Sequence, residues 1–234
     1  MVRRTKEEAL ITRDRILDAA EQTFSVRGVS RTSLGDIAVA AGVTRGAIYW
    51  HFKDKSELFC AMIGRVTLPM EAQHQQAEER FASDPLGYIR WFSLNILERT
   101  EKDEQCRRVF DILVHKCEYL DEMAEVKRRF SKMREGCTAR IQKAFAAAHA
   151  LGMTRSSADA GTAAAGLQVL IDGLITHWLA ERRGSLLRTG RAVIGLYLEG
   201  LTVVPRTPAR RGASATVAKA VRTGAPSAAR VAAR

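Results

Sequence analysis

Residues 32–52, which read TSLGDIAVAAGVTRGAIYWHF, constrain the fold of this chain more than any other stretch. Ser33 can cap a helix, and Asp36 stands three residues later, where the acidic partner of a capping box belongs. Apolar residues follow at helical spacing until Gly42, where a glycine takes the left-handed backbone conformation at low cost. The pattern predicts a short amphipathic helix that ends in a glycine turn.

A second short helix is predicted after this turn. The hydroxyl of Thr44 can cap it, and Ile48 and Phe52, four residues apart, can pack inward together. Arg45 and Tyr49 then face outward. Two helices joined by a glycine turn, the second with a basic outer face, are typical of a helix-turn-helix that enters the DNA major groove. Ordinary helical hairpins share this geometry, so the spacing alone leaves both interpretations open.

The residues themselves favour DNA binding. The segments TSLGDIA, AGVTRGAIYWHF and KDKSELF resemble the DNA-binding motif of the tetracycline-repressor (TetR) family. The opening MVRRTKEEA and the tetrapeptide HKCE at residues 115–118 are similar to its AcrR-like subgroup, the repressors of multidrug efflux pumps. The resemblance is specific over residues 1–60, patchy further on and absent after residue 204.

The resemblance implies an all-α fold with two domains. The first is a TetR-type helix-turn-helix domain at residues 10–70, with the motif itself at residues 33–52. The second, at residues 71–204, is a larger helical domain for ligand binding and dimerisation. Residues 205–234 hold seven Lys or Arg and no Asp or Glu, so they supply most of the net charge of +11. This composition predicts a disordered tail, which is either solvated or in sequence-independent contact with DNA.

A short basic arm of Arg3, Arg4 and Lys6 precedes the first helix and allows the same two interpretations as the tail.

Several classes of protein are disfavoured by composition. The chain has no run of 18 consecutive apolar residues and no apolar segment near its N-terminus, which predicts a cytoplasmic protein without a membrane partner. The four cysteines form no CxxC pair, so neither a disulfide nor a metal site is expected, and no cofactor is implied. His115 and Cys117 are too weak a pair to indicate an enzyme.

Helical spacing and capping signals continue along the chain. Asp54 with Glu57 starts a helix, and Pro69 should kink or break that helix near Val66 because proline removes a backbone donor. Asp84 followed by Pro85 restarts helical structure. Further helices are predicted from apolar periodicity at residues 12–27, 104–114, 122–148 and 156–181, with a last one around residues 193–201.

The last two predicted helices are apolar over more than one face. With no later element to cover them, a second copy of the chain is the expected cover, and in the TetR family these helices form a four-helix dimer interface.

Family positions imply the DNA contacts. Arg45 would read a guanine with two hydrogen bonds, helped by Thr44 and by the close approach possible at Gly46. The remaining positions would contact the phosphates of double-stranded operator DNA, through side chains or through the front of the first motif helix: Tyr49, His51, Lys55, Thr32 and Ser33.

The resemblance also implies a pocket for a small hydrophobic ligand between the later helices. Its expected walls are apolar: Val66, Ile89, Phe92, Ile96, Phe110, Leu113, Val114, Met133, Cys137, Ile141, Ile171 and Ile175. The expected polar points are Gln168, Asp172 and His115. A carboxylate such as Asp172 on an apolar face must find a partner, a ligand donor or water.

These observations lead to a ligand-responsive transcriptional repressor, released from its operator by hydrophobic drugs. Two alternatives remain open. One is a TetR-like repressor of other genes that responds to a metabolite. The other is an architectural protein that binds DNA without sequence preference through its basic tail.

Overall fold

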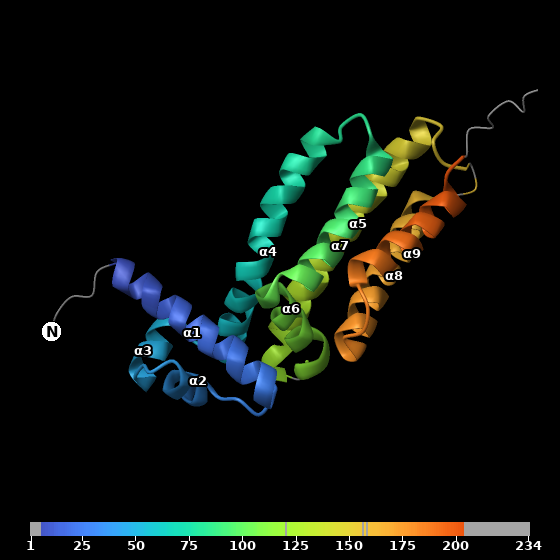
Figure 1. The fold of residues 1–234 in the computed structure, drawn as a ribbon. Coiled ribbons are helices and arrows are strands. Elements are labelled where there is room, and N and C mark those ends of the chain that lie inside the picture. The colour runs from blue at the N-terminus through green and yellow to red at the C-terminus, as the bar shows by residue number, and fades with distance from the viewer. Residues whose placement is uncertain (1–5, 120, 156, 158, 204–234) are drawn as a thin grey trace, which may run out of the picture. The chain divides into compact units, whose positions relative to one another are not determined.

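The computed structural model describes residues 6–119, 121–155, 157 and 159–203. Over these residues the fold is all-α, as predicted: nine α-helices follow one another, with a single isolated bridge between Thr154 and Thr202 (Figure 1). The predicted tail at residues 205–234 and the arm residues Arg3 and Arg4 lie outside the described residues.

The first three helices are α1 (Lys6–Arg27), α2 (Leu34–Ala40) and α3 (Arg45–His51). The capping box predicted at Ser33 is present in both halves, and the side chain of Thr44 accepts a hydrogen bond from the backbone N–H of Ala47. Gly42 has a φ of 64°, the left-handed conformation that the turn requires. Apolar side chains of all three helices meet in one buried core: Ile16, Leu17, Phe24, Leu34, Ile37 and Ile48.

Helix α4 (Lys55–Arg80) runs without interruption through Pro69. Of the kink or break predicted near Val66, the break is therefore wrong. Pro69 is exposed, so water can reach the carbonyl of Arg65 that loses its helical partner. The buried positions Val66, Met70 and His74 lie on one face on both sides of the proline, and their packing holds the helix together.

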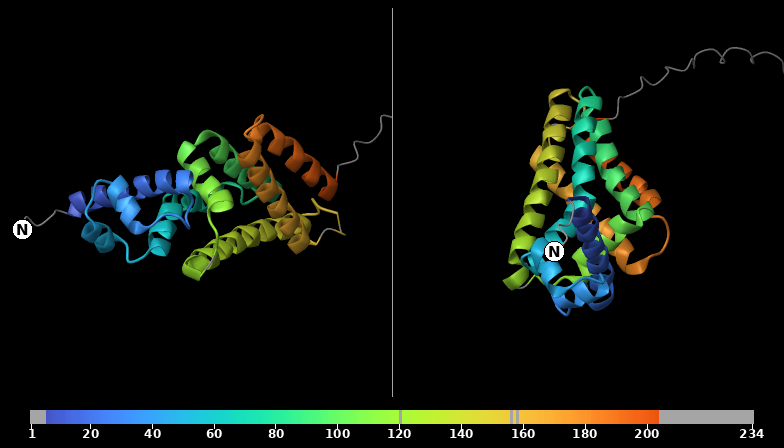
Figure 2. Two further views of the ribbon diagram at one scale, coloured as in Figure 1. Left: turned by 90° about the horizontal axis from the view of Figure 1, so that it is seen from below. Right: turned by 90° about the vertical axis from the view of Figure 1, so that its left-hand side faces the viewer.

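The later helices are α5 (Pro85–Lys102), α6 (Glu104–Asp111), α7 (Ala124–Ala150), α8 (Ala160–Glu181) and α9 (Leu186–Leu201). Helix α7 packs against α5 and α8, and α9 packs against the same two helices (Figure 2). Their apolar faces form a second buried core around Ile89, Leu97, Ile141, Leu167 and Ile194.

The helix predicted at residues 104–114 is regular α-helix over only part of that range. Regular α-helix ends at Asp111, and residues Ile112–Lys116 form a π-helical turn. Such a turn leaves backbone carbonyls without their usual partners. Two of them are satisfied from elsewhere, because the Tyr119 hydroxyl donates to the carbonyl of Leu113 at 3.0 Å and the backbone N–H of Val29 donates to that of Lys116 at 2.9 Å.

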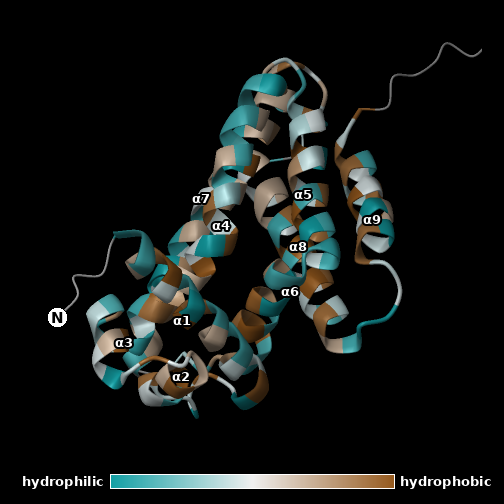
Figure 3. Ribbon diagram, turned by 60° about the vertical axis from the view of Figure 1, so that its left-hand side comes forward, coloured by the Kyte–Doolittle hydropathy of each residue, from teal (hydrophilic) through white to brown (hydrophobic). Residues whose placement is uncertain are grey.

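By length and composition alone, helix α8 is long and apolar enough to cross a membrane. Of its most apolar 18-residue segment, 33% is buried in the protein. It also carries Gln168 and Asp172 and packs against α7 and α9, as a core helix of a helical domain does. Apolar residues occur along both α8 and α9 in Figure 3. Part of this surface is exposed, including Val169 and Leu196.

Candidate DNA-binding helix and ligand cavity

Helix α3 is held on one side and free on the other. Ile48 and Phe52 are 0% and 1% exposed, so they anchor the helix in the core as predicted. Arg45 and Gly46 in its first turn are exposed, and a side chain added at Gly46 would meet only the hydroxyl oxygen of Thr44, at 4.0 Å. The positive end of the helix can therefore come close to a negatively charged surface.

The outer face of α3 is basic and aromatic. The guanidinium of Arg45 lies 5.8 Å from the ring centre of Tyr49, a cation–π contact between two exposed side chains. Trp50 is 73% exposed and meets the ring of His51 edge-on at 4.6 Å. Sequence reasoning missed Trp50, although a residue two positions after buried Ile48 must lie on a different face of a helix.

Thr32 and Ser33 were expected to offer donors to phosphate, but the structure uses these donors internally. Thr32 is 1% exposed, and its hydroxyl donates to the carbonyl of Gly28 at 2.8 Å. The backbone N–H and the hydroxyl of Ser33 both donate to the carboxylate of Asp36, at 2.9 and 2.6 Å. The Thr32 hydroxyl thus satisfies a carbonyl just after α1, and the capping box uses both donors of Ser33.

Lys55, which was expected to contact a phosphate, likewise has its donors engaged within the protein. Its side chain is 11% exposed, and its Nζ donates to the carbonyls of Val29 and Thr32, both at 3.1 Å. It also forms an ion pair with Glu122 at 2.7 Å. Three negative or partly negative oxygens thus surround one ammonium group, which ties the start of α4 to the α1–α2 loop and to the segment before α7.

The α1–α2 loop and helix α1 have further contacts with the later helices. Val29 donates its N–H to Lys116 in the π-helical turn. Arg65 of α4 pairs with Asp18 of α1 at 2.7 Å, and the Gln105 side chain of α6 donates to Glu21 of α1 at 2.8 Å. Helix α1 is therefore connected to α4, α6 and the π-helical turn at once.

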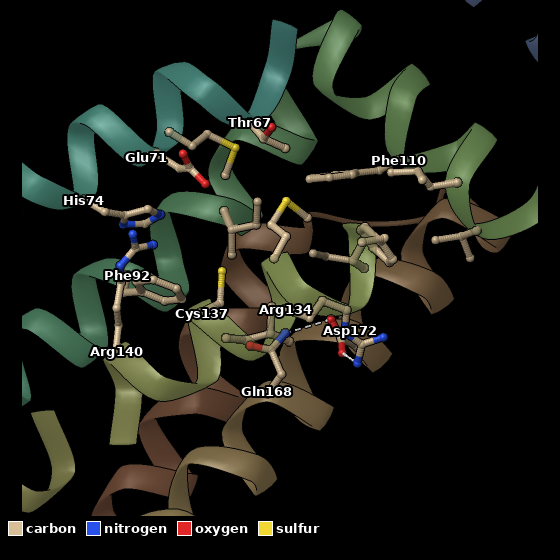
Figure 4. A pocket seen from close by; sticks show the side chains of 18 of the residues that line it. Thr67, Glu71, His74, Phe92, Phe110, Arg134, Cys137, Arg140, Gln168 and Asp172 are labelled. Atoms are coloured by element: carbon tan, nitrogen blue, oxygen red, sulfur yellow. Dashed lines mark hydrogen bonds and ion pairs between the residues drawn. The ribbon is translucent and has the colours of Figure 1, made fainter. Parts of the chain in front are cut away.

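A cavity of about 170 Å³ lies between α4, α5, α6, α7 and α8 (Figure 4). Eleven of the predicted ligand-binding residues line it: Phe92, Ile96, Phe110, Leu113, Val114, Met133, Cys137, Gln168, Ile171, Asp172 and Ile175. Three predicted wall residues do not. Val66, Ile89 and Ile141 are 2%, 0% and 0% exposed and fill the protein core, one helical turn away from the lining residues Met70, Phe92 and Cys137 on the same helices. His115 also does not line it, and its Nδ1 instead lies 3.0 Å from a carboxylate oxygen of Asp111.

One end of the cavity is polar but internally paired. Asp172 forms an ion pair and hydrogen bond with Arg134 of α7, and the Gln168 amide donates to its other oxygen at 3.0 Å. Burial raises the pKa of Asp172, and the positive charge of Arg134 opposes that rise. The expected need of Asp172 for a partner is thus met by Arg134, which the sequence did not indicate.

The opposite end of the cavity was missed at the sequence level. Its polar residues are Glu71 and His74 of α4 and Arg140 of α7 (Figure 4). The other lining residues that were missed are Thr67, Met70, Phe130, Arg134 and Thr176. Met70 and His74 follow Val66 at intervals of four, so helical spacing would have found them if the helix had not been expected to break at Pro69.

Within the described residues, no group of three or more His, Cys, Asp or Glu side chains is arranged to hold a metal ion. Burial raises the pKa of the Cys106 thiol to about 12 and that of Cys117 to about 11, which keeps both thiols protonated near neutral pH.

Two family descriptions match this chain. Residues 16–62 match the bacterial regulatory proteins of the tetR family, and residues 84–202 match the C-terminal region of MAATS-type transcriptional repressors. The protein belongs to the TetR family of transcriptional regulators. The first match contains α2 and α3, and the second contains the helices α5 to α9.

Individual TetR-family proteins are similar over most of this chain. The HTH-type transcriptional regulator AcrR of Shigella flexneri is 39% identical over 221 residues, which cover 89% of this chain and 99% of AcrR. NalD, the secondary repressor of the MexAB-OprM multidrug efflux pump in Pseudomonas aeruginosa, superposes with a TM-score of 0.78 at 34% identity, covering 84% of this chain and 98% of NalD. SmeT, the repressor of the Stenotrophomonas maltophilia pump SmeDEF, is similar in its complex with triclosan, with a TM-score of 0.70, 30% identity and coverage of 87% and 100%.

Proposed function

We propose that this TetR-family regulator represses a multidrug efflux operon from the cytoplasm, as a homodimer that binds operator DNA through α3, and that hydrophobic drugs in the cavity release it. The similarity to NalD and SmeT, both repressors of multidrug efflux pumps, supports the choice of operon. The cavity supports the choice of signal.

The size of the cavity is the observation that supports release of the protein from DNA by a ligand. A cavity of about 170 Å³ is close to the ~150 Å³ space that holds a single benzene ring, whereas pockets for drug-sized ligands measure ~300–1,000 Å³. A drug with several rings therefore fits only if the lining helices move apart. Such a ligand would bind the conformation with spread helices and not the present one. This difference in affinity is what a population shift requires.

The π-helical turn at residues 112–116 would transmit that movement. Leu113 and Val114 of this turn line the cavity, and Lys116 of the same turn accepts the hydrogen bond from Val29 in the α1–α2 loop. Lys55 holds the same loop through the carbonyls of Val29 and Thr32. A shift of the turn by an entering ligand would pull on the loop that leads into α2 and α3.

Two copies of α3 would read two half-sites. Recognition helices about 34 Å apart, or a multiple of that, match successive major grooves of a palindrome-like operator. Arg45 would read guanine, with Thr44 and Gly46 allowing close approach, while Tyr49 and His51 contact phosphates together with the exposed Trp50. A change in the separation of the two helices would lower affinity for both half-sites at once.

The dimer would form through α8 and α9. Val169 and Leu196 are 67% and 70% exposed, and Ala165, Gly173 and Ala192 around them are exposed and small. A side chain added at Gly173 would meet nothing within 4 Å. Large apolar side chains beside small ones allow a second copy to pack closely on this surface.

The test is binding of the purified protein to DNA from upstream of its own gene, compared with unrelated DNA of equal length in moderate salt. Selective binding that several chemically unrelated drugs weaken is the expected result. Selective binding that no drug disturbs, but a metabolite does, would replace the efflux assignment by a metabolite-responsive regulator. Equal binding to both DNAs would contradict sequence-specific repression.

A further inference from the structure

The end of the cavity between His74 and Arg140 contains an unsatisfied hydrogen-bonding group. His74 is 4% exposed, and its Nδ1 has no hydrogen-bond partner among the described residues. The ring is fixed in place, because it stacks on Phe92 with ring centres 4.5 Å apart and meets Trp91 edge-on at 5.4 Å. A buried polar atom without a partner is rare in folded proteins and is costly unless something satisfies it.

Arg140 adds a positive charge beside this ring. It comes from α7 and faces His74 across the end of the cavity (Figure 4). Its Nε forms an ion pair with Glu78 of α4 at 3.7 Å, but its guanidinium donates no hydrogen bond within the described part of the chain. By contrast, Arg134 at the other end is both ion-paired with Asp172 and hydrogen-bonded to it.

The local field at His74 is positive. Burial, together with the positive charges of Arg140 and Arg99, lowers the pKa of His74 to about 4. The imidazole is therefore neutral near pH 7, and the ring nitrogen that carries its hydrogen can act as a donor. Glu71 also lines this end but is exposed to solvent, and its charge is not among the causes of the shift at His74.

We infer that His74 and Arg140 form a subsite for the acidic oxygen of an aromatic ligand, a carboxylate or an ionised phenol. The oxygen would accept hydrogen bonds from the imidazole and from the guanidinium, while the aromatic part lies along Phe92 and the apolar wall. This subsite deepens the proposed function, since it names the ligands that release the regulator most effectively: aromatic acids before aromatic cations. The ion pair at the opposite end has no unpaired charge to compete for the same group.

The experiment compares three probes of the same size by calorimetry on the purified full-length protein: 2-naphthoate, the uncharged 2-naphthamide and the cationic 2-naphthylmethylammonium. The wild type should bind 2-naphthoate about tenfold or more tighter than the amide, as expected for charge-assisted hydrogen bonds, and the cation weakest. Arg140→Gln and His74→Phe should each remove most of this preference and leave binding of the amide within about twofold of the wild type. Lys143→Gln, which removes one exposed charge from the same helix, should change nothing.

Three results would overturn the subsite: no detectable binding of 2-naphthoate, equal binding of the acid and the amide, or an equal loss for all three probes in Arg140→Gln. Tighter binding of the cation would assign this end of the cavity to Glu71 and would also overturn it. Operator binding is measured on the same preparations. Because the probe affinities need no DNA, loss of the proposed repressor function and loss of the subsite are separate outcomes.

Discussion

Arg45 is the residue on which the proposed readout of DNA sequence depends. It is exposed at the first turn of α3 and makes a cation–π contact with Tyr49. Replacement by alanine should weaken operator binding by about 1–3 kcal/mol per half-site while unrelated DNA is bound almost as before, because a bidentate guanine contact is lost. Fluorescence anisotropy with labelled operator measures this. Arg90→Ala removes another exposed charge, on α5, and should have little effect; an equal loss in both variants would mean that Arg45 contributes only charge.

Lys55 offers a sharper test, because its two possible roles predict different results. In the structure it bonds two loop carbonyls and Glu122. Lys55→Met should therefore lower the free energy of unfolding by about 1–3 kcal/mol, since buried acceptors lose their donor. The salt dependence of operator binding should stay unchanged. A phosphate contact would instead reduce the slope of log affinity against log salt concentration by about one per subunit, with no loss of stability.

His74 should make stability depend on pH. Its pKa is lowered from 6.5 to about 4 in the folded state, so the unfolded chain binds more protons between these values. Stability is therefore full above pH 6.5 and falls as the pH drops towards 4, by at most about 3 kcal/mol. Denaturant unfolding at several pH values measures it. His74→Phe should flatten this part of the profile, and an unchanged profile in the variant would assign the dependence to other groups.

The apolar cavity residues were more accessible to sequence reasoning than the polar ones. Residues such as Met133 and Cys137 belong to a long apolar stripe, and such a stripe indicates which face of the helix is buried. Arg134 and Arg140 flank that stripe, where a charge normally lies in solvent, and their partners are on α8 and α4. Lys55 was assigned to DNA from the family resemblance, and no local pattern shows that its side chain reaches a loop 23 residues earlier in the chain.

Among the structural elements, the helix starts marked by an N-cap side chain were predicted correctly, whereas α1 begins at Lys6 instead of residue 12 and α9 at Leu186 instead of residue 193. Side chains at Thr44, Asp54 and Asp84 all accept the backbone hydrogen bonds expected of N-caps, since capping is decided within four residues. The π-helical turn at residues 112–116 was not predicted. It depends on donors from Tyr119 and from Val29, which is distant in sequence, and the residues of the turn itself look helical.

The continuity of α4 leads to a prediction for Pro69. The proline is exposed and lies inside a helix of 26 residues, so it costs a backbone hydrogen bond without a packing gain. Pro69→Ala should raise the free energy of unfolding by about 1–3 kcal/mol. Thermal unfolding of the two proteins measures the difference. A less stable variant would mean that α4 needs a bend at this position.

At the scale of the whole molecule, the proposed dimer interface on α8 and α9 would determine whether two α3 helices can act together. Leu196→Glu places like charges opposite each other in the proposed dimer interface, so it should give a monomer that binds operator weakly. Leu151→Glu alters a comparably exposed leucine at the end of α7 and should remain dimeric. Analytical ultracentrifugation distinguishes them. A dimeric Leu196→Glu would place the interface elsewhere.

The most direct test of coupling between the cavity and DNA is the affinity of one multi-ring hydrophobic drug, measured by calorimetry for the free protein and for the protein saturated with operator. If the drug must spread the helices around a cavity of about 170 Å³, operator-bound protein should bind it about tenfold or more weaker, and by reciprocity the drug should weaken operator binding by the same factor. Equal drug affinity in both states, with binding located in the cavity, would contradict the proposed release mechanism.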